Sequence, residues 1–215
     1  MNKINYQKEL DKIIEQNVRE DRVPSLLLHS CCAPCSSYTI EYLSQYFKIT
    51  VLYYNPNISP KSEYEKRKSE QLRLIDEMKT KYPVSFLDCD YDYDEFSRIT
   101  DEDYGNEEID YYYEGGERCF RCYRLRLERT AILAKNNAFD FFCTTLSISP
   151  LKNSQKINEI GFELEKKYGI KWLPSDFKKK EGYKRSIVLS KEYNLYRQNF
   201  CGCAFSKAES IENKE

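Results

Sequence analysis

The sequence predicts an α/β fold, an open and mostly parallel sheet flanked by helices, in a single domain over residues 1–215. Short apolar segments alternate with segments of helical periodicity along most of the chain. The first apolar segment, Leu26–Leu28, has no polar alternation, as expected of a parallel strand that is covered on both faces. A length of 215 residues suits one α/β domain and is short for two.

The first part of the chain should form three helices and three strands. Residues 6–20 place apolar side chains on one side of a helix, and Pro24 ends that region. A strand over residues 26–30 follows, and the apolar spacing of residues 36–47 is helical. Residues 49–54 are rich in β-branched and aromatic side chains, which favour a strand, and a turn-rich loop comes next. The remaining elements are a charged helix over residues 61–80, with Leu72, Ile75 and Met78 facing inward, and a strand over residues 84–87.

Residues 88–118 differ in composition from their surroundings. The segment is acidic and rich in tyrosine, and it contains Gly115-Gly116 near its end. We interpret it as an excursion on the rim of the fold rather than a separate domain. Its simplest structure would be a solvated loop with one short helix.

Regular alternation resumes in the last part of the chain. Helices are expected over residues 121–136, 154–168 and 186–198, and strands over residues 139–144 and 170–173. The β-α order implies parallel strands with right-handed crossovers and helices on both faces. Ligands bind such sheets outside the carboxyl ends of the strands, so one site is expected at that edge.

Composition and charge narrow the class of protein. The chain is 40% hydrophobic and 14% aromatic, which is enough for a core and excludes intrinsic disorder. No apolar stretch is long enough to cross a membrane, and the N-terminus lacks the apolar segment of a signal peptide. A cytoplasmic protein without a membrane partner is therefore expected. The net charge of −1 means that any nucleic-acid binding would require a local basic patch.

Cysteine is the unusual component. The chain has 9 cysteines, an odd number, and no export signal, which argues against a secreted disulfide scaffold. Cys89 and Cys143 stand alone and are interpreted as small core residues. The other cysteines form three tight groups: Cys31, Cys32 and Cys35; Cys119 and Cys122; and Cys201 and Cys203.

Two of these groups are suited to binding metal. Cys31, Cys32 and Cys35 follow the first strand, and Cys119 and Cys122 lie just before a predicted helix on the same rim. Helix N-termini stabilise thiolates through their dipole and free N–H groups. The spacing leaves an iron–sulfur cluster, a zinc site and dithiol chemistry open, because a strand followed by Cys-Ala-Pro-Cys also resembles a thioredoxin-like motif.

The third group is typical of a redox device. Glycine between Cys201 and Cys203 lets the backbone bend so that the two sulfurs can meet, and a disulfide in so small a ring would be strained and labile. The alternative is a further pair of metal ligands. The single histidine, His29, is expected to be a hydrogen-bonded core residue, and the absence of others excludes Cys/His zinc fingers and most Ser-His or Cys-His hydrolases. No dinucleotide or P-loop motif is present.

Basic side chains are concentrated in two regions. Tyrosines are interleaved with them, and such mixtures clamp backbone phosphates and stack on unpaired bases, although a charge run is more often a solvated face. The first region surrounds the second cysteine group, and the second precedes the last predicted helix. Their members are Arg118, Arg121, Arg124, Arg126 and Arg129, and Lys178, Lys179, Lys180, Lys184 and Arg185.

Six motifs in order resemble one known family. They are His29-Ser30-Cys31-Cys32-Ala33-Pro34-Cys35, Tyr54-Asn55-Pro56-Asn57-Ile58, Arg118-Cys119-Phe120-Arg121-Cys122-Tyr123, Thr144-Thr145-Leu146-Ser147-Ile148-Ser149-Pro150, Asp176-Phe177-Lys178-Lys179 and Tyr196-Arg197-Gln198-Asn199-Phe200-Cys201-Gly202-Cys203. Over about residues 24–206 the chain resembles the cobalamin-independent epoxyqueuosine reductases of the QueH type. The resemblance implies reduction of epoxyqueuosine to queuosine at the wobble position of tRNA, and a fold similar to the nucleotide α-hydrolase (HUP-like) group.

The resemblance also assigns residues. It implies that Cys31, Cys32, Cys119 and Cys122 hold a [4Fe-4S] cluster and that Cys201 and Cys203 are a redox-active pair. An adjacent iron or other divalent metal is expected, with Cys35 as its candidate ligand. From the two basic regions, Arg121, Lys179, Lys180 and Arg185 are the candidate tRNA contacts. Because no flavin or nicotinamide motif is visible, an external donor is expected to supply the electrons. Asp176, Tyr183 and Tyr196 are candidate proton donors. A zinc module that binds RNA and a thioredoxin-like dithiol reductase remain the alternatives.

Overall fold

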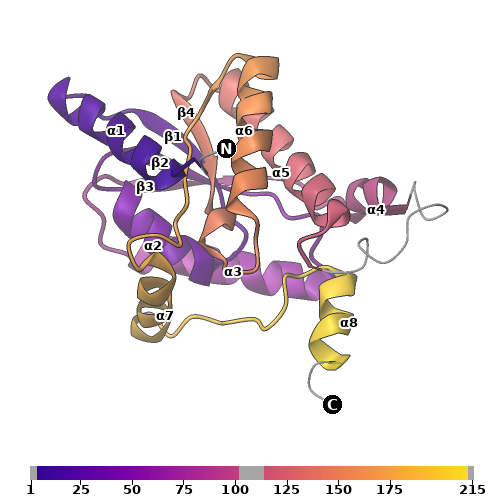
Figure 1. Cartoon of the computed structure of the whole chain (residues 1–215). Coiled ribbons are helices and arrows are strands. Elements are labelled where there is room, and N and C mark those ends of the chain that lie inside the picture. Colours follow the sequence, from indigo (N-terminus) through magenta and orange to yellow (C-terminus); the bar gives the residue numbers. More distant parts are fainter. Residues whose placement is uncertain (1–3, 102–113, 213–215) are drawn as a thin grey trace.

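The computed structural model describes residues 4–101 and 114–212. Its centre is one sheet of five parallel strands in the order β3-β2-β1-β4-β5 (Figure 1). This confirms the predicted α/β class and its parallel sheet. The strands are β1 (Ser25–His29), β2 (Lys48–Tyr53), β3 (Val84–Asp88), β4 (Phe141–Thr144) and β5 (Lys171–Trp172).

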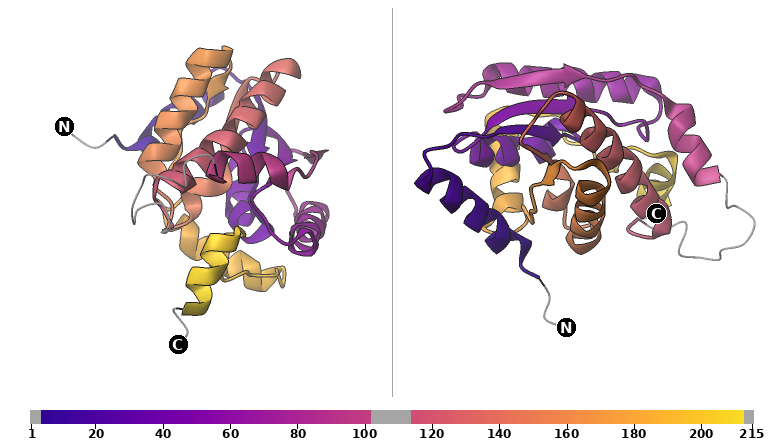
Figure 2. Two further views of the ribbon diagram at one scale, coloured as in Figure 1. Left: turned by 90° about the vertical axis from the view of Figure 1, so that its right-hand side faces the viewer. Right: turned by 90° about the horizontal axis from the view of Figure 1, so that it is seen from above.

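Helices cover both faces of the sheet (Figure 2). On one side α2 packs against α3 and α7, and on the other α5 packs against β1, β4 and α6. α1 contacts both layers, since Tyr6 meets Phe162 of α6 and Gln7 reaches Tyr42 of α2. The helices are α1 (Tyr6–Arg19), α2 (Ala33–Leu43), α3 (Lys61–Glu77), α4 (Tyr93–Asp101), α5 (Glu117–Asn136), α6 (Ser154–Tyr168), α7 (Gly182–Glu192) and α8 (Ala204–Glu212), with a 3₁₀ turn η1 (Thr145–Ile148).

The core lies on both sides of the central strands. Leu26, Leu27 and Leu28 of β1 are fully buried between β2 and β4, as the apolar run predicted. Burying three leucine side chains stabilises the fold by roughly 5–9 kcal/mol before the entropic cost of ordering them. β1 is thereby fixed as the central strand, and the residues that follow it at its carboxyl end are held on a rigid support.

Several helix boundaries differ from the predicted ones, and those of α2, α5 and α7 bear on the site. α2 begins at Ala33, because Pro34 occupies the first turn, where its fixed φ and missing N–H are tolerated. α5 begins at Glu117, so Cys119 and Cys122 lie within its first turns rather than before it. α7 ends at Glu192, and the segment after it leads to α8, a helix that the sequence analysis did not predict.

The inward face of α3 was also predicted wrongly in part. Leu72 is exposed, whereas Met78 is buried and Ile75 is half-buried. The buried face of α3 includes the polar side chains of Arg67 and Gln71. A helix that turns polar residues inward does not show its buried face in its apolar spacing.

The acidic excursion over residues 88–118 is described in part. It contributes α4, which packs against α5, and residues 102–113 lie outside the described part of the chain. Phe96 of α4 is buried beside Cys122 and Cys203. The excursion therefore supplies a wall of the cysteine-rich region. No helix in the described residues is long and apolar enough to cross a membrane.

Candidate metal and thiol site

The first cysteine group lies at the point where the strand order of the sheet reverses, between β1 and β4. The chain runs outward from β1 through β2 to β3, and β4 and β5 lie on the other side of β1. Crevices open outside the carboxyl ends of the strands at such a switch point. Cys31 and Cys32 follow β1 after one residue, Ser30, and Cys32 is the N-cap of α2. The dipole and free N–H groups of α2 therefore favour negative charge on these sulfurs.

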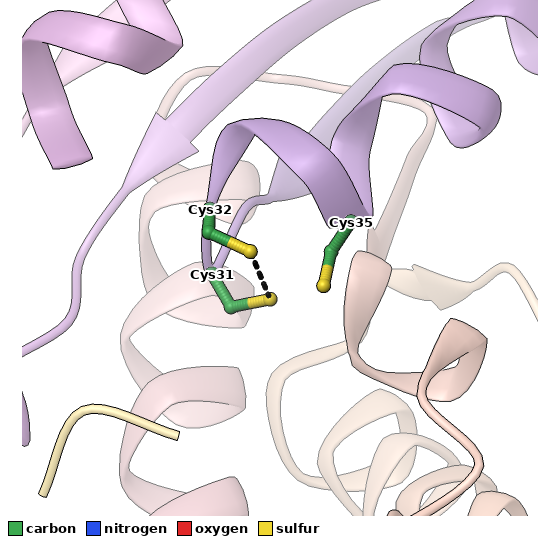
Figure 3. A group of neighbouring side chains, drawn as sticks. All are labelled: Cys31, Cys32 and Cys35. Atoms are coloured by element: carbon green, nitrogen blue, oxygen red, sulfur yellow. Dashed lines mark hydrogen bonds between the residues drawn. The ribbon is translucent and has the colours of Figure 1, made fainter. Parts of the chain in front are cut away.

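The three sulfurs of this group converge. The Sγ atoms of Cys31, Cys32 and Cys35 all lie within 4.8 Å of one another, and those of Cys31 and Cys32 are 3.9 Å apart. Figure 3 shows the three side chains pointing toward a common space at the start of α2. Two thiolates on one tetrahedral ion would lie about 3.8 Å apart, given metal–sulfur bonds of about 2.3 Å. The group therefore fits sulfur ligation of a metal.

Neighbouring elements hold this loop in place. Ser30 and Ser36 both donate hydrogen bonds of 2.7 Å to Oε1 of Gln71 on α3. The amide of Asn55 donates to the carbonyl of Ser30 at 2.8 Å. The backbone N–H of Cys31 donates to Oγ1 of Thr145 in η1 at 3.3 Å. The buried polar residues of α3 and of the loops after β2 and β4 thus preorganise the thiols.

The three thiols differ in pKa because they hydrogen-bond to one another. Hydrogen bonds from Cys32 and Cys35, followed by Thr145 and the charge of Lys152, hold the pKa of Cys31 well below its usual range. The same hydrogen bond to Cys31 raises the pKa of Cys32 to about 12, and contacts with both sulfurs raise the pKa of Cys35. Cys31 is therefore the most acidic thiol of the group, and a metal would displace the remaining protons.

A pocket of about 300 Å³ opens in front of this group. Its walls are the three cysteines, residues 148–152 after η1, Tyr183 and Ser186 of α7, Glu114, and residues 197–201. Figure 1 shows that residues 193–203 run along the lower side of the molecule from α7 to α8. The pocket is large enough for a small polar ring system beside the thiols.

The other cysteines meet in a second, smaller pocket. Cys119 and Cys122 of α5 line it together with Cys201 and Cys203. Cys201 and Glu114 line both pockets, so Cys201 stands between the two cysteine groups. The structure therefore brings all seven clustered cysteines to one edge of the sheet, where the first two groups were predicted to lie, and distributes them over two adjoining pockets.

Buried cations surround this region. Arg67, Arg118 and Arg126 are each 1% exposed. Arg126 lines the second pocket, and Cys122 and Cys201, with a further contribution from Cys31, raise its pKa against the opposing effect of burial. Within residues 4–101 and 114–212, Nη2 of Arg126 and the hydroxyl of Tyr123 have no hydrogen-bond acceptor. Buried donors of this kind fit an anionic group with sulfur acceptors.

These positions correct part of the basic-patch interpretation. Arg118 and Arg126 were grouped with candidate phosphate contacts, but both are buried, and Arg118 lies over the ring of Phe205. Arg124 pairs with Glu163. Arg129 pairs with Glu95 at 3.4 Å. Arg118 and Arg126 are therefore interior charges, whereas Arg124 and Arg129 are partly exposed side chains that pair with acidic residues.

The Cys201-Gly202-Cys203 segment is anchored by its backbone. The carbonyl of Cys201 accepts from Nη1 of Arg67 at 2.9 Å, and the carbonyl of Gly202 accepts from the backbone N–H of Ser59 at 2.9 Å. Gly202 has φ +128°, and a Cβ there would lie 2.8 Å from Ile58. Only glycine fits this turn without displacement. Both cysteines are free thiols, and burial raises the pKa of Cys203.

The candidate tRNA contacts lie in different settings. Lys179 is exposed, and Arg121 lies 3.9 Å from Glu117. Lys180 pairs with Asp11 at 2.7 Å, and Arg185 pairs with Glu41 and Glu192 at 2.6 and 3.0 Å. Their role stays a prediction.

Of the candidate proton donors, only Tyr183 lines the large pocket. Asp176 pairs with Lys178 at 3.3 Å. The hydroxyl of Tyr196 donates to the carboxylate of Glu63 at 3.2 Å.

The remaining predicted residues have structural settings. His29 is fully buried, with Nδ1 2.8 Å from Oγ1 of Thr144 and Nε2 3.0 Å from the carbonyl of Tyr54. Because a carbonyl only accepts, Nε2 carries the proton, and burial lowers the pKa of His29 to about 3. It is the neutral, hydrogen-bonded core residue that was predicted. Cys143 is fully buried in the core, whereas Cys89 is half-buried.

The sequence analysis missed one charged group at the centre of the site. Lys152 lines the large pocket, and its Nζ lies 3.3 Å from Sγ of Cys201 and 3.0 Å from Oε1 of Glu114. Its position after Ser149-Pro150, in the loop beyond β4, was a usable signal, because that loop belongs to the carboxyl edge of the sheet.

The fold and the site together define a parallel α/β protein whose ligand crevice is lined by thiols, the arrangement expected of a thiol- or metal-dependent oxidoreductase. The family model described as epoxyqueuosine reductase QueH matches residues 26–209. The chain belongs to this family.

Individual relatives cover most of the chain. It is 44% identical to the epoxyqueuosine reductase QueH of Staphylococcus epidermidis over 95% of this chain and 85% of the relative. It is 45% identical to that of Streptococcus pyogenes over 98% of this chain and 81% of the relative. The match to the protein of Thermotoga maritima is 37% over 87% of this chain and 93% of the relative. The expected family is thereby confirmed.

Proposed function

We propose that this protein reduces epoxyqueuosine to queuosine in tRNA. The observation that carries the proposal is the pocket lined by three convergent thiols at the switch point of the sheet, in a chain of the epoxyqueuosine reductase QueH family. The reaction removes the epoxide oxygen and leaves an alkene. Two electrons enter from an external one-electron donor, and two protons leave with the oxygen as water.

A [4Fe-4S] cluster held by Cys31, Cys32, Cys119 and Cys122 is the proposed cofactor. Its support is the convergence of thiols at the start of α2, the thiols in the first turns of α5, and the buried cation of Arg126 on the wall of the second pocket. A bound cluster would supply one-electron transfer. Cys35, whose sulfur points into the same space, is the proposed ligand of an adjacent iron or other divalent metal.

The second pocket offers a different ligand set. Cys119, Cys122, Cys201 and Cys203 all line it, so four thiols are available there without Cys31 and Cys32. We nevertheless propose Cys201 and Cys203 as the redox-active pair. The support is the position of Cys201 on the wall of both pockets, from which a dithiol could serve the substrate and the cofactor.

The fold is proposed to be of the nucleotide α-hydrolase (HUP-like) type, in one domain and in a cytoplasmic protein. The parallel order β3-β2-β1-β4-β5, with the site beside β1 and β4, supports this assignment. In this arrangement the substrate nucleoside would enter from the carboxyl edge, past α7 and the loop over residues 148–152.

Electrostatic binding of the tRNA backbone is expected from Arg121, Lys179, Lys180 and Arg185. If all four contact phosphates, affinity should fall about 50-fold between roughly 50 and 200 mM salt. Reversing the four charges should flatten the dependence of log Kd on log salt. The measurement is tRNA binding by fluorescence anisotropy across a salt series.

The matched control reverses four charges at the opposite edge of the sheet. These are Lys48, Lys135, Lys166 and Lys171. The control should keep the slope of the unaltered protein. An affinity that is independent of salt, or equal slopes for the two quadruple variants, would remove the assigned phosphate contacts.

Complementation tests the proposed function in cells. A bacterium that lacks its own epoxyqueuosine reductase accumulates tRNA with epoxyqueuosine, and expression of this chain should replace it by queuosine in digested tRNA. Anaerobic purification separates the alternatives. Iron with acid-labile sulfide supports the reductase, stoichiometric zinc a zinc module that binds RNA, and metal-free protein a thioredoxin-like dithiol reductase.

A further inference from the structure

Lys152 is a buried ammonium on the wall of the large pocket. Its side chain is 6% exposed, and it shares the pocket with Cys31, Cys32 and Cys35. The other cationic side chain on this wall, Arg197, belongs to an exposed residue and donates to Oγ of Ser190. Lys152 therefore supplies the buried positive charge beside the thiols.

The backbone of Lys152 is held in place from two sides. Its N–H donates to the carbonyl of Ser149 at 3.2 Å. Nζ of Lys178 donates to the carbonyls of Lys152 and Ser147, both at 3.2 Å. These bonds fix the loop after η1 against the segment before α7. The backbone that carries the ammonium is thus held in place beside the pocket.

The ammonium retains a donor for a ligand. Lysine has three N–H donors, and among the residues that the structure describes two of them meet Oε1 of Glu114 and Sγ of Cys201. Burial alone would favour the neutral amine, but the nearby Cys201, Tyr123 and Glu114 raise the pKa of Lys152 well above its ordinary value. Within residues 4–101 and 114–212, Lys152 is therefore a buried cation with one N–H donor that meets no acceptor.

We propose that Lys152 is a catalytic residue that donates a hydrogen bond to the epoxide oxygen of the substrate. This inference rests on the proposed function. As a C–O bond of the epoxide breaks, negative charge develops on the oxygen, while the electrons enter from the external donor. A fixed ammonium in a site shielded from water stabilises that charge much more than water would.

The setting distinguishes this role from a structural one. A lysine that served only to hold Glu114 and the Cys201 segment in place would affect the binding of substrate and of product equally. A donor to the epoxide oxygen distinguishes substrate from product, because queuosine has an alkene where that oxygen was. The discriminating quantity is therefore the ratio of the two tRNA affinities, in addition to the reduction rate.

The experiment compares Lys152→Met with Lys156→Met, a control at a half-buried lysine in the first turn of α6 that lies outside both pockets, 3.9 Å from Glu159. Single-turnover reduction is measured at saturating tRNA, with iron content and the affinities for epoxyqueuosine-tRNA and queuosine-tRNA. Lys152→Met should lower the rate about 100-fold or more with unchanged iron and should lose the preference for epoxyqueuosine-tRNA. Lys156→Met should match the unaltered protein.

A second variant is used in case Lys152→Met does not fold. Lys152→Gln keeps N–H donors for Glu114 and Cys201 without the positive charge, and it should show the same two losses. An iron-loaded variant at position 152 that keeps the full rate, or that keeps the affinity ratio, overturns the proposal. If the unaltered protein reduces no epoxyqueuosine, the proposed function fails instead, so the two failures are distinguishable.

Discussion

Single serine substitutions of Cys31, Cys32, Cys119 and Cys122 should each remove most of the iron and the visible absorbance of the anaerobically purified protein. A serine oxygen is a poor replacement for a thiolate on iron, and the remaining three ligands leave one iron exposed. Epoxyqueuosine reduction should fall to background in all four variants. Iron and sulfide analysis, visible absorption and nucleoside analysis of tRNA provide the readouts.

The matched control is Cys89→Ser. Cys89 is half-buried and belongs to neither cysteine pocket, so its substitution should leave iron and colour intact. Full iron in all four ligand variants would exclude the assignment. Retention of iron by the variants at positions 31 and 32, together with its loss at positions 119, 122, 201 and 203, would instead locate the metal in the second pocket.

The second large effect is expected from the double variant Cys201→Ser, Cys203→Ser. It should keep its iron and lose multiple turnover, because a dithiol beside the pocket would hold two reducing equivalents between turnovers. Partial reduction in a single turnover should survive when the cluster is reduced beforehand. Steady-state and single-turnover rates, measured on preparations of known iron content, separate these outcomes.

Two results would contradict this role for the pair. Loss of iron from the double variant would make Cys201 and Cys203 structural ligands, as their position in the pocket with Cys119 and Cys122 allows. A steady-state rate equal to that of the unaltered protein would make both thiols dispensable. The Cys89→Ser protein is again the control for a thiol removed elsewhere.

The sheet was predictable because its pattern is simple. Apolar runs such as Leu26–Leu28 occur where a strand is covered on both faces, and the helix-containing segments between the runs are long enough for parallel crossovers. The start of α2 and the inward face of α3 were not predictable in the same way. A proline such as Pro34 is found in the first turn of a helix as well as at a helix end, so it does not decide between the two. Arg67 and Gln71 are buried because they hydrogen-bond to residues of the site, which apolar spacing does not show.

The site was predictable in its thiols but not in its charges. Spacing in the sequence grouped the cysteines, and topology brought the groups to one edge. Arg118, Arg126 and Lys152 look like surface residues in a sequence, because most charged side chains are solvated. Their burial depends on packing between α5, α8 and the loop after η1, which no local pattern reports.

The most direct measurement is nucleoside analysis of tRNA after incubation with the anaerobically purified protein and a one-electron reductant. The tRNA carries epoxyqueuosine, and iron and sulfide are measured on the same preparation. We predict loss of one oxygen from the nucleoside, with more queuosine formed than protein present, and no conversion by Cys31→Ser. Unchanged epoxyqueuosine after incubation with fully iron-loaded protein would contradict the proposed function.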